Sequence, residues 1–564
     1  MKPLKTTLAL LLFIFITSSH GACAQTADAT MLPPSEKITE LISDYDNDKT
    51  PGGVILVMRN GEVIYTRAFG MANLSYGVPF TASTPTNIGS TSKQFTAFAI
   101  GLLEEQGQLS LDDDIRKYIP ELPELGDTVR LWHLVAHTSG YREYLNSLAM
   151  AGRMLGDHID YREIIPLVQR QPELQNIPGD TYNYNNTGYA LLAMVVERIT
   201  GDKFPDWMEA NVFLPLGMKN TLVLRNRGQV IPGSAQGYGR DDDESFIKLA
   251  DLSASMGPGG IYSTAEDLAK WVLNFYEPKV GRQALIEKMQ TSFVKNDGEK
   301  LGYGFGLMID EKDGLQRVYH GGADIAHRSE LYMYPDIKGA VITQSNNNRF
   351  SGSIALRTAE AFFADVMELQ DKDDADPEDF EYDPEKFDEL VGRYELEVAP
   401  GFILEFTREG DTLYTQATGQ GRVEIYASSD STFFLTVVDA NVTFHRNEDG
   451  EVDAMTLHQN GNHRANRLWE PAWTPSQEVL EMYLGRYFSE ELEAFYEVAL
   501  NDEDALVLRH RRFSDILLKA EAEDEYSGSF PVSGVQFIRN DEGVVTGFKA
   551  SSGRSFGIVF EKQP

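Results

Sequence analysis

One serine and one lysine stand three residues apart at the start of a segment with helical periodicity. The string Ser90-Thr91-Ser92-Lys93 follows Gly89, and apolar residues then recur at the spacing of one helical face. Side chains three residues apart on a helix lie on the same face. A lysine held there in a dry cleft loses its proton readily enough to help deprotonate the serine. Backbone N–H groups at the helix start can stabilise an oxyanion. The pattern predicts Ser90 as a nucleophile.

The Ser-x-x-Lys spacing alone carries little information, because it occurs twice more in the chain. Ser245 precedes Lys248, and Ser292 precedes Lys295. Neither copy has the glycine lead-in and the long amphipathic segment that accompany Ser90. We therefore expect these two copies to be coincidental, and substitution of either serine to leave hydrolysis largely intact.

Two short motifs further along the chain could complete such a site. Tyr184 and Asn186 follow an expected turn and precede a helix expected over 189–199. There a phenol could relay a proton and an amide could donate to a carbonyl. The string His320-Gly321-Gly322-Ala323 ends an expected strand, and paired glycines let a substrate backbone approach a strand edge. Each motif alone is also typical of an ordinary turn or strand end.

Taken together, the motifs resemble the serine β-lactamase-related family. That family contains class C β-lactamases, penicillin-binding carboxypeptidases, esterases and D-aminopeptidases. The Tyr-x-Asn string lies 94 residues after the serine, and His-Gly-Gly lies another 136 residues on, in the family's order. The resemblance runs from about residue 37 to 365 and includes Leu-Val-Ala-His-Thr-Ser-Gly at 134–140. We expect His137 in that string to be structural, at a turn.

The resemblance implies a role for each motif. Ser90 would be the acylated nucleophile, while Lys93 and Tyr184 would share the proton relay between the nucleophile and the leaving group. The backbone N–H groups of Ser90 and Ala323 would form the oxyanion hole, and Asn186 would hold a substrate amide. The residues expected to bind substrate are Asn186, His320, Gly322 and Ala323.

One departure from the family pattern concerns His320. Class C β-lactamases usually carry Lys-Thr-Gly where this chain has His-Gly-Gly, and that lysine helps to hold the substrate's carboxylate. A histidine is mostly neutral near pH 7 and binds anions less well, which argues against dedicated β-lactamase or free-carboxylate peptidase activity. The string resembles the D-aminopeptidase branch, whose members also carry two C-terminal eight-stranded barrels.

Strand and helix signals alternate from about residue 30 to 365. For the catalytic domain, residues 25–370, the family resemblance implies an α+β fold with an antiparallel sheet flanked by helices plus a helical subdomain. Asn60-Gly61 between two apolar runs is a hairpin signal, and Ser263 with Glu266 is typical of a helix capping box. The acidic segment 371–377 then looks like a linker.

An internal repeat follows the linker. Gly392-Arg393-Tyr394 recurs as Gly485-Arg486-Tyr487, and Phe444-x-Arg446-Asn447 recurs as Phe537-x-Arg539-Asn540, both with an offset of 93 residues. Short alternating segments between turn residues favour small antiparallel barrels, which have no exposed sheet edges. We expect two lipocalin-like β-barrel modules, 371–470 and 471–564, that fold apart from the catalytic domain, carry no chemistry and pack beside the cleft.

The N-terminus has the order of a secretory signal over residues 1–24. Lys2 and Lys5 precede the apolar run Leu8-Ile16, and Ala22-Cys23-Ala24 follows. The run is too short for the roughly 30 Å of bilayer hydrocarbon, so we expect no transmembrane anchor. Cleavage would remove the chain's one cysteine and exclude disulfides and thiolate catalysis. The expected location is periplasmic or secreted, and a lipid anchor on Cys23 is the alternative.

Charge and composition limit the classes of molecule that the chain can be expected to bind. The chain has 86 Asp+Glu against 50 Lys+Arg, a net charge of -36, which disfavours nucleic acid and anionic membranes. No metal-ligand spacing or phosphate-binding glycine loop occurs, so neither a metal nor a cofactor is expected. The substrate would be a small peptide or ester. Three readings stay open: a peptidase on D-amino-acid-containing or peptidoglycan-type peptides, an esterase or weak β-lactamase, and a non-catalytic binding protein. The oligomeric state is left open.

Overall fold

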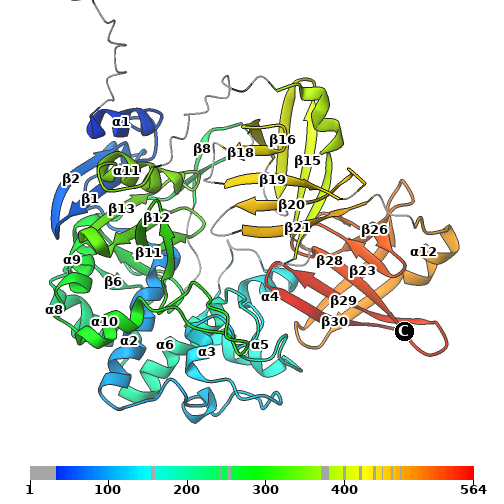
Figure 1. The fold of residues 1–564 in the computed structure, drawn as a ribbon. Helices are drawn as coiled ribbons and strands as arrows, with labels where there is room; N and C mark the ends of the chain where they lie inside the picture. The colour runs from blue at the N-terminus through cyan, green and yellow to red at the C-terminus, as the bar shows by residue number, and fades with distance from the viewer. Residues whose placement is uncertain are drawn as a thin grey trace, which may run out of the picture.

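The computed structural model, shown in Figure 1, describes most of residues 33–564. The residues not described within that range are 154–156, 158, 242, 250–255, 370–379, 381, 398–401, 418–421, 436–439, 448, 459–461 and 470–472. The expected signal segment 1–24, with Cys23, and the acidic linker 371–377 lie outside the described residues. No helix in the described part of the chain is long and apolar enough to cross a membrane.

A six-stranded antiparallel sheet forms the centre of the first region. Its strand order is β10-β11-β12-β13-β1-β2. Asn60 and Gly61, both at positive φ (53° and 75°), join β1 to β2, so the expected two-residue hairpin turn is confirmed. The strand bounds are β1 Gly53–Arg59, β2 Glu62–Phe69, β10 Met308–Lys312, β11 Leu315–Ala323, β12 Arg328–Tyr334 and β13 Gly339–Ser345.

Both faces of this sheet are covered by helices. On β1, Val54 and Leu56 point into the cluster that contains helices α2 and α9, while Ile55 and Val57 point into the cluster that contains α1 and α11. This alternation explains why β1 is apolar at every position, since successive strand residues face opposite sides. The helix bounds are α1 Pro34–Leu41, α2 Lys93–Glu105, α9 Ala265–Tyr276 and α11 Ser353–Phe363.

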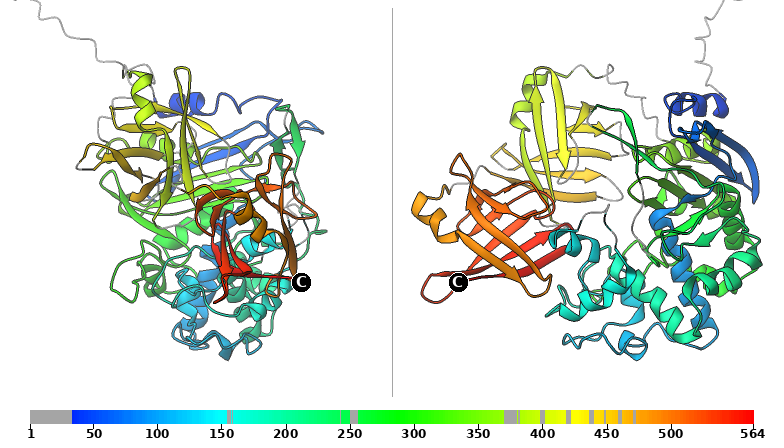
Figure 2. Two further views of the ribbon diagram at one scale, coloured as in Figure 1. Left: turned by 90° about the vertical axis from the view of Figure 1, so that its right-hand side faces the viewer. Right: turned by 180° about the vertical axis from the view of Figure 1, so that it is seen from behind.

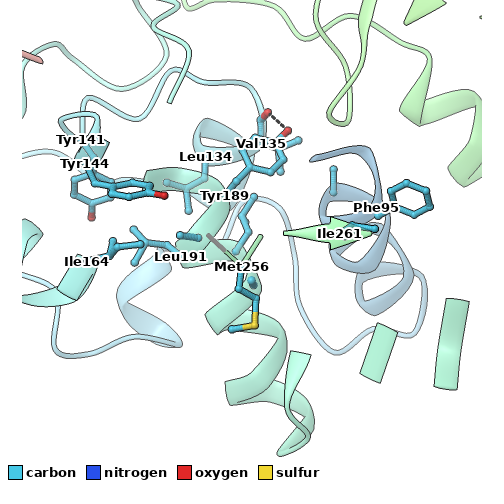
Figure 3. Packing of buried hydrophobic residues seen from close by; sticks show 14 of the residues in the cluster. Phe95, Leu134, Val135, Tyr141, Tyr144, Ile164, Tyr189, Leu191, Met256 and Ile261 are labelled. Carbon is cyan, nitrogen blue, oxygen red and sulfur yellow. Dashed lines mark hydrogen bonds between the residues drawn. The ribbon is translucent and has the colours of Figure 1, made fainter. Parts of the chain in front are cut away.

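A helical subdomain lies against α2. Helix α2 is buried from Lys93 to Leu103, so it is the central helix of this part of the chain. Figure 3 shows Tyr189 of α6 among Leu134, Val135 and Met256, and its hydroxyl donates to the Val135 carbonyl at 2.9 Å. The other helices are α3 Leu131–Val135, α4 Tyr144–Met150, α5 Ile164–Arg170, α6 Asn186–Thr200, α7 Phe204–Met208, α8 Leu214–Leu216 and α10 Gln283–Met289.

The expected capping box at the start of α9 is wrong by one residue. Thr264 is the N-cap, and its Oγ1 accepts a hydrogen bond from the Asp267 N–H at 3.2 Å. Ser263 belongs to the short strand β9, and its Oγ lies 2.8 Å from Thr221 Oγ1. The minor strands are β3 Met71–Asn73, β4 Val78–Pro79, β5 Thr86–Asn87, β6 Leu222–Val223, β7 Tyr238–Arg240, β8 Phe246–Lys248 and β9 Ile261–Ser263.

Barrel 1, residues 392–468, is a closed antiparallel barrel of eight strands, β14 to β21. It lies on the same side of the catalytic region as the second barrel, in yellow in Figure 1 and from behind in Figure 2. Its strands are β14 Gly392–Leu396, β15 Ile403–Glu409, β16 Thr412–Ala417, β17 Val423–Ala427, β18 Thr432–Leu435, β19 Ala440–Arg446, β20 Val452–His458 and β21 Asn462–Leu468.

Barrel 2, residues 485–562, follows the same plan with one strand interrupted. Its sheet runs from β25 around to β26, and Leu518 alone separates these two ends, so the barrel is nearly closed. The pair β25–β26 stands where barrel 1 has β17. The elements are α12 Gln477–Tyr483, β22 Gly485–Ser489, β23 Ala494–Leu500, β24 Leu506–Arg509, β25 Ile516–Leu517, β26 Lys519–Ala522, β27 Glu525–Ser527, β28 Gly534–Arg539, β29 Val545–Ser552 and β30 Ser555–Lys562.

The repeat is visible in contacts as well as in strands. The Tyr394 hydroxyl donates to the carbonyl of Leu390 at 2.9 Å, and 93 residues later the Tyr487 hydroxyl donates to Tyr483 at 2.6 Å. Both barrels therefore use the tyrosine of the Gly-Arg-Tyr string to fasten the segment that enters the barrel. The expectation of two related barrel modules is confirmed.

The expectation that both modules fold apart from the catalytic domain is wrong for barrel 2. The buried residues of barrel 2 form one continuous apolar cluster with those of α2, α4 and α6. The Tyr496 hydroxyl also donates to the Met150 carbonyl at the end of α4, at 2.9 Å. Barrel 1 has a separate core. The acidic linker indicated a domain boundary, but it carries no information about which apolar surfaces pack together after folding. The prediction of an independent barrel 2 was wrong for this reason.

Candidate active site

Ser90 and Lys93 meet at the start of helix α2. A short 3-10 helix, Gly89–Ser92, leads directly into α2 and carries Ser90 at the cleft surface. Lys93 Nζ lies 3.1 Å from Ser90 Oγ, as the spacing of three residues predicted. Its other hydrogen bonds go to the Asn186 side-chain oxygen at 2.8 Å and the Pro258 carbonyl at 3.0 Å. All three partners are uncharged.

The surroundings of Lys93 favour its neutral form. Its side chain is fully buried, and burial lowers the pKa of Lys93 well below the usual value. The positive charge of Arg554 lowers the pKa of Lys93 further, whereas the negative charge of Glu143 raises it. A neutral amine within hydrogen-bond distance of a hydroxyl can accept its proton.

Tyr184 lies on the other side of the serine. Its side chain is partly buried, and a hydrogen bond joins its hydroxyl to the Ser90 side chain. Burial raises the pKa of Tyr184, while that hydrogen bond and the charge of Arg554 lower it in part. Lys93 Nζ lies 4.6 Å from the centre of the Tyr184 ring. The phenol stays protonated at neutral pH, so it is placed to give a proton rather than to take one.

Asn186 connects Lys93 to a buried carboxylate that sequence reasoning missed. The Asn186 Oδ1 accepts from Lys93, and its Nδ2 donates to Glu143 Oε1 at 2.8 Å. Glu143 is itself the N-cap of α4, where Oε2 accepts from the Asn146 N–H at 2.8 Å. One Asn186 amide hydrogen is left for a substrate. The only sequence signal for Glu143 was an acidic residue ahead of a helix, and nothing in it pointed to Asn186.

The His-Gly-Gly string lies on an open stretch of β11. Strand β10 pairs with Leu315–Tyr319 only, so the edge of β11 from His320 to Ala323 is unpaired on that side. A Cβ on Gly322 would lie 2.0 Å from the Ile88 carbonyl, and a Cβ on Gly89 would lie 2.5 Å from the Ala323 nitrogen. Only glycines allow this approach, and it brings Ala323 beside the helix start that carries Ser90.

His320 does not face the cleft as an exposed cation. Its side chain is buried, and burial together with Lys93 lowers the pKa of His320 to about 3. Its Nδ1 lies 2.5 Å from the Gly321 carbonyl oxygen, so this nitrogen carries the proton and Nε2 is an acceptor. The Tyr303 hydroxyl lies 3.3 Å and the Tyr184 hydroxyl 3.4 Å from Nε2.

His137 is structural, as expected, and it orients this network. The Asn185 N–H donates to His137 Nδ1 at 2.9 Å, so the neutral ring carries its proton on Nε2. That nitrogen lies 3.1 Å from the Tyr303 hydroxyl, which can in turn donate to His320 Nε2. Burial lowers the pKa of His137 well below its usual range. Because Tyr303 serves His320, the Tyr184 hydroxyl is free for Ser90.

The other Ser-x-x-Lys copies form no such site. Ser245 precedes β8 on an exposed hairpin, with Lys248 exposed at its end. Lys295, after Ser292, is paired with Asp297 and Glu299 rather than with a serine. Neither serine lies at the start of a buried helix.

A single cleft of about 1100 Å³ contains these groups. It is lined by Ser90, Tyr184, Asn186 and the open edge of β11, by Asn441 and His458 of barrel 1, and by Arg554 of barrel 2. Sequence reasoning missed Arg554, because it lies 370 residues after its contact Tyr184. In the described residues, no group of three acidic, histidine or cysteine side chains is arranged to hold a metal ion.

Comparison with known proteins agrees with this geometry. The β-lactamase family model matches residues 38–364. The chain belongs to this family. A model for a domain of unknown function matches residues 377–471, which include barrel 1. Members of the β-lactamase family that resemble this chain are named as penicillin-binding proteins and D-aminopeptidases, and the protein is a serine hydrolase of β-lactamase fold.

Three relatives illustrate the range. Penicillin-binding protein 4* of Bacillus subtilis is 27% identical over 426 residues, which cover 73% of this chain and 93% of that protein. A D-aminopeptidase of Gluconobacter oxydans is 26% identical over 298 residues, 53% of this chain and 56% of that protein. The octameric penicillin-binding protein homologue of Pyrococcus abyssi shares the fold, with a TM-score of 0.56, 24% identity, and coverage of 77% of this chain and 99% of that one.

Proposed function

We propose that this protein cleaves amide bonds in peptides that contain D-amino acids, through an acyl-enzyme on Ser90. The observation that carries the proposal is the 3.1 Å contact between Ser90 Oγ and a buried lysine with a lowered pKa. Relatives named as D-aminopeptidases and as a penicillin-binding protein support the substrate class.

The chemistry would proceed in two steps. Neutral Lys93 takes the Ser90 proton while Oγ attacks the carbonyl carbon, and the oxyanion is held by the backbone N–H groups of Ser90 and Ala323. The C–N bond then breaks as the leaving amine takes the Tyr184 proton, which Lys93 replaces. Water attacks the ester in the second step and releases the acid and free Ser90. Asn186 keeps Lys93 in place and offers one N–H to the substrate amide.

Export is part of the proposal. It rests on the positive, apolar and small-residue order of residues 1–24. N-terminal sequencing of protein recovered from the cell envelope or medium tests it, and a mature chain beginning near Gln25 is expected. A mature chain that begins at a lipid-modified Cys23 would favour the anchored form instead.

Acylation of Ser90 is tested by mass spectrometry after treatment with a slow acylating inhibitor. The adduct is expected on the peptide that contains Ser90, and Ser90→Ala should abolish both labelling and hydrolysis. Ser245→Ala and Ser292→Ala are matched controls from the other Ser-x-x-Lys copies and should behave as wild type. A folded protein that takes no label would favour the binding-protein reading.

The substrate class is tested by a panel. D-amino-acid amides, D-Ala-D-Ala peptides, short esters and a chromogenic cephalosporin are compared by kcat/KM on the wild-type protein. Preference for the D-amino-acid compounds is expected. Faster turnover of esters or of the cephalosporin alone would favour an esterase or weak β-lactamase using the same Ser90 chemistry.

A further inference from the structure

One turn of barrel 2 is built into the active site. The turn between β29 and β30 contains Gly553, at φ +50°, where a Cβ would lie 2.6 Å from the Asn146 side chain of α4. Next to it, Ser555 Oγ donates to the Glu143 carbonyl at 2.8 Å and lies 3.0 Å from Ser147 Oγ. The turn is therefore shaped to fit against the start of α4, close to the Glu143–Asn186–Lys93 chain.

The same turn is fixed from a second direction. The Arg554 carbonyl accepts from the side chains of Gln175 at 3.2 Å and Asn183 at 3.0 Å. Asn183 is the neighbour of Tyr184, so barrel 2 and the loop that carries the tyrosine are held together. With its backbone bound on both sides, the turn gives Arg554 a defined position.

The Arg554 guanidinium projects into the cleft beside Tyr184. Its Nη1 donates to the Tyr184 carbonyl at 3.3 Å, and its central carbon lies 5.2 Å from the centre of the Tyr184 ring. The side chain is partly exposed and lines the same cleft as Ser90. Among the described residues, no carboxylate lies within ion-pair distance of it. Most of its five N–H donors are left for another group.

The other basic side chains near Ser90 are neutral or already have partners. Burial favours the neutral forms of Lys93 and His320. Arg317 is buried and paired with Asp310 at 2.7 Å. Arg328 also lines the cleft; its Nη1 donates to the carbonyls of Asp324 and His327 at 2.8 and 2.7 Å, and the nearby Asp324 carboxylate offsets part of its charge.

Lys312, which also lines the cleft, is remote from the serine. It lies on β10 opposite Leu315, five residues along β11 from His320. At about 3.3 Å per residue, that separation is about 16 Å. Near the serine, Arg554 is therefore the basic side chain that offers most of its N–H groups without a nearby carboxylate partner.

We propose that Arg554 binds a carboxylate of the substrate next to the scissile bond, so that barrel 2 supplies a specificity-determining residue of the active site. A guanidinium with free N–H groups forms paired hydrogen bonds with a carboxylate, and a partly dry cleft strengthens them. The inference rests on the proposed function, since it concerns substrates of the Ser90 acyl-enzyme. It adds the class: acyl compounds that carry a negative charge beside the bond to be cut. His320 alone argued against such substrates, and in this proposal Arg554 supplies the positive charge that His320 does not.

The test uses matched aryl esters on the full-length protein. In each pair, one ester carries a carboxylate and the other carries a carboxamide at the same position. Two such pairs are used: one has the group on the leaving phenol, and the other has it on the acyl part. We measure the ratio of kcat/KM for carboxylate to carboxamide. In the wild type it should favour the carboxylate in at least one pair. Arg554→Gln should lower that ratio about 10- to 100-fold, mainly through KM, as expected for loss of a charged hydrogen bond.

Two further variants separate charge from position. Arg554→Lys keeps the charge without the planar fork and should give an intermediate ratio. Arg512→Gln is the matched control, because Arg512 also joins barrel 2 to the catalytic region, through Asp157 at 2.7 Å, but lies outside the cleft lining. It should leave the ratio at the wild-type value.

Three results would overturn the inference. The first is a wild-type ratio near one in both pairs, and the second is a ratio that Arg554→Gln leaves unchanged. The third is an equal loss of kcat/KM on both members of each pair in Arg554→Gln, which would mean that Arg554 only supports Tyr184. Should Arg554→Gln not fold, inhibition of the wild type decides: a free hydroxybenzoate should compete better than its carboxamide, and equal inhibition rejects the inference. Failure of the wild type to acylate at Ser90 is a separate result, which rejects the proposed function.

Discussion

Lys93 Nζ lies 3.1 Å from Ser90 Oγ at the cleft surface, and its two other hydrogen-bond partners are an amide oxygen and a backbone carbonyl. A lysine that served only to stabilise the fold would be expected to face a carboxylate, because an unpaired buried charge is costly. Here burial favours the neutral amine instead. In the proposed mechanism this neutral amine is the base that accepts the Ser90 proton.

The first prediction concerns Lys93 and Tyr184 as one relay. Lys93→Met and Tyr184→Phe should each lower kcat/KM on an ester by about 10²- to 10⁴-fold, the range for loss of a general acid or base. The double variant should lose little more than the worse single variant, because residues that act as a unit are not additive. Steady-state kinetics on the four proteins measure this. Losses that multiply in the double variant would show two independent roles.

The second prediction concerns the pH dependence of kcat/KM. The proposed mechanism needs neutral Lys93, so the rate should rise as pH rises through the Lys93 pKa. The negative charge of Glu143 raises the pKa of Lys93 and the positive charge of Arg554 lowers it. Glu143→Gln should therefore move the acid limb to lower pH, and Arg554→Gln should move it to higher pH.

The opposite signs make this pH prediction specific. His137 and His320 also face Lys93, but burial lowers the pKa of both well below the usual range, so they stay neutral near pH 7. Rate profiles between pH 5 and 10 on a substrate without ionisable groups give the limb directly. Shifts in the same direction for both variants, or none, would contradict the assignment of the limb to Lys93.

The sequence was sufficient to predict contacts between residues that are close together in the chain. Ser90 and Lys93 share one helical turn, so their contact follows from a spacing of three residues, and the Asn60-Gly61 hairpin follows from its turn residues. The barrels were predictable for a different reason. Their sequences repeat with a constant offset of 93 residues, and the structure repeats with them. The hydrogen bond from the Tyr394 hydroxyl to a backbone carbonyl recurs at Tyr487.

Contacts across long sequence distances could not be predicted in this way. Glu143 meets Asn186 only after α4 and α6 pack, and Arg554 meets Tyr184 only after barrel 2 docks. Neither residue has a local pattern that distinguishes it from other acidic or basic residues on turns. The docking itself depends on apolar residues such as Tyr496. Alternation along a strand predicts that such a residue is buried, but it does not say whether the residue faces the barrel interior or an interface with another domain.

The third prediction concerns Glu330 on β12. Its carboxylate lies behind Gly321 and Gly352, where added Cβ atoms would be 2.7 Å from its two oxygens. Burial raises the pKa of Glu330 to about 8, although Arg317 and Arg328 lower it in part. Between its ordinary value and pH 8 the folded state holds a proton that the unfolded state has lost. The free energy of unfolding should therefore fall as pH rises through this window.

Replacing this carboxyl with an amide removes the effect. We compare the free energy of unfolding of Glu330→Gln with that of the wild type. The variant minus wild-type difference should be higher at pH 9 than at pH 5 by more than about 1 kcal/mol, because one pKa unit corresponds to about 1.4 kcal/mol. Thermal unfolding at pH 5, 7 and 9 measures it. Glu311→Gln, an exposed acidic residue on β10, is the control and should show no such trend. A difference that does not depend on pH would be inconsistent with a partly buried, protonated Glu330.

The last prediction concerns the ion pair that docks barrel 2. Arg142 Nε donates to Glu491 Oε1 at 2.6 Å, with side chains only 4% and 7% exposed, and the guanidinium also donates to the Phe556 carbonyl. Glu491→Ala would leave the Arg142 charge buried without its partner, at a cost of about 3–5 kcal/mol. Two residues on, Glu493 pairs with Arg170 at 3.4 Å but is 68% exposed. Glu493→Ala should cost at most about 1 kcal/mol.

The docking pair also connects stability to activity. Arg142 precedes Glu143, whose carboxylate holds Asn186, so loosening barrel 2 should lower hydrolysis along with the melting temperature. Calorimetry and limited proteolysis of barrel 2 measure the first effect, and ester turnover measures the second. The double variant Arg142→Met with Glu491→Leu should recover most of the stability, because apolar side chains of similar size replace a buried pair at little cost. Equal melting temperatures for Glu491→Ala and Glu493→Ala would show that barrel 2 is held by its apolar contacts alone.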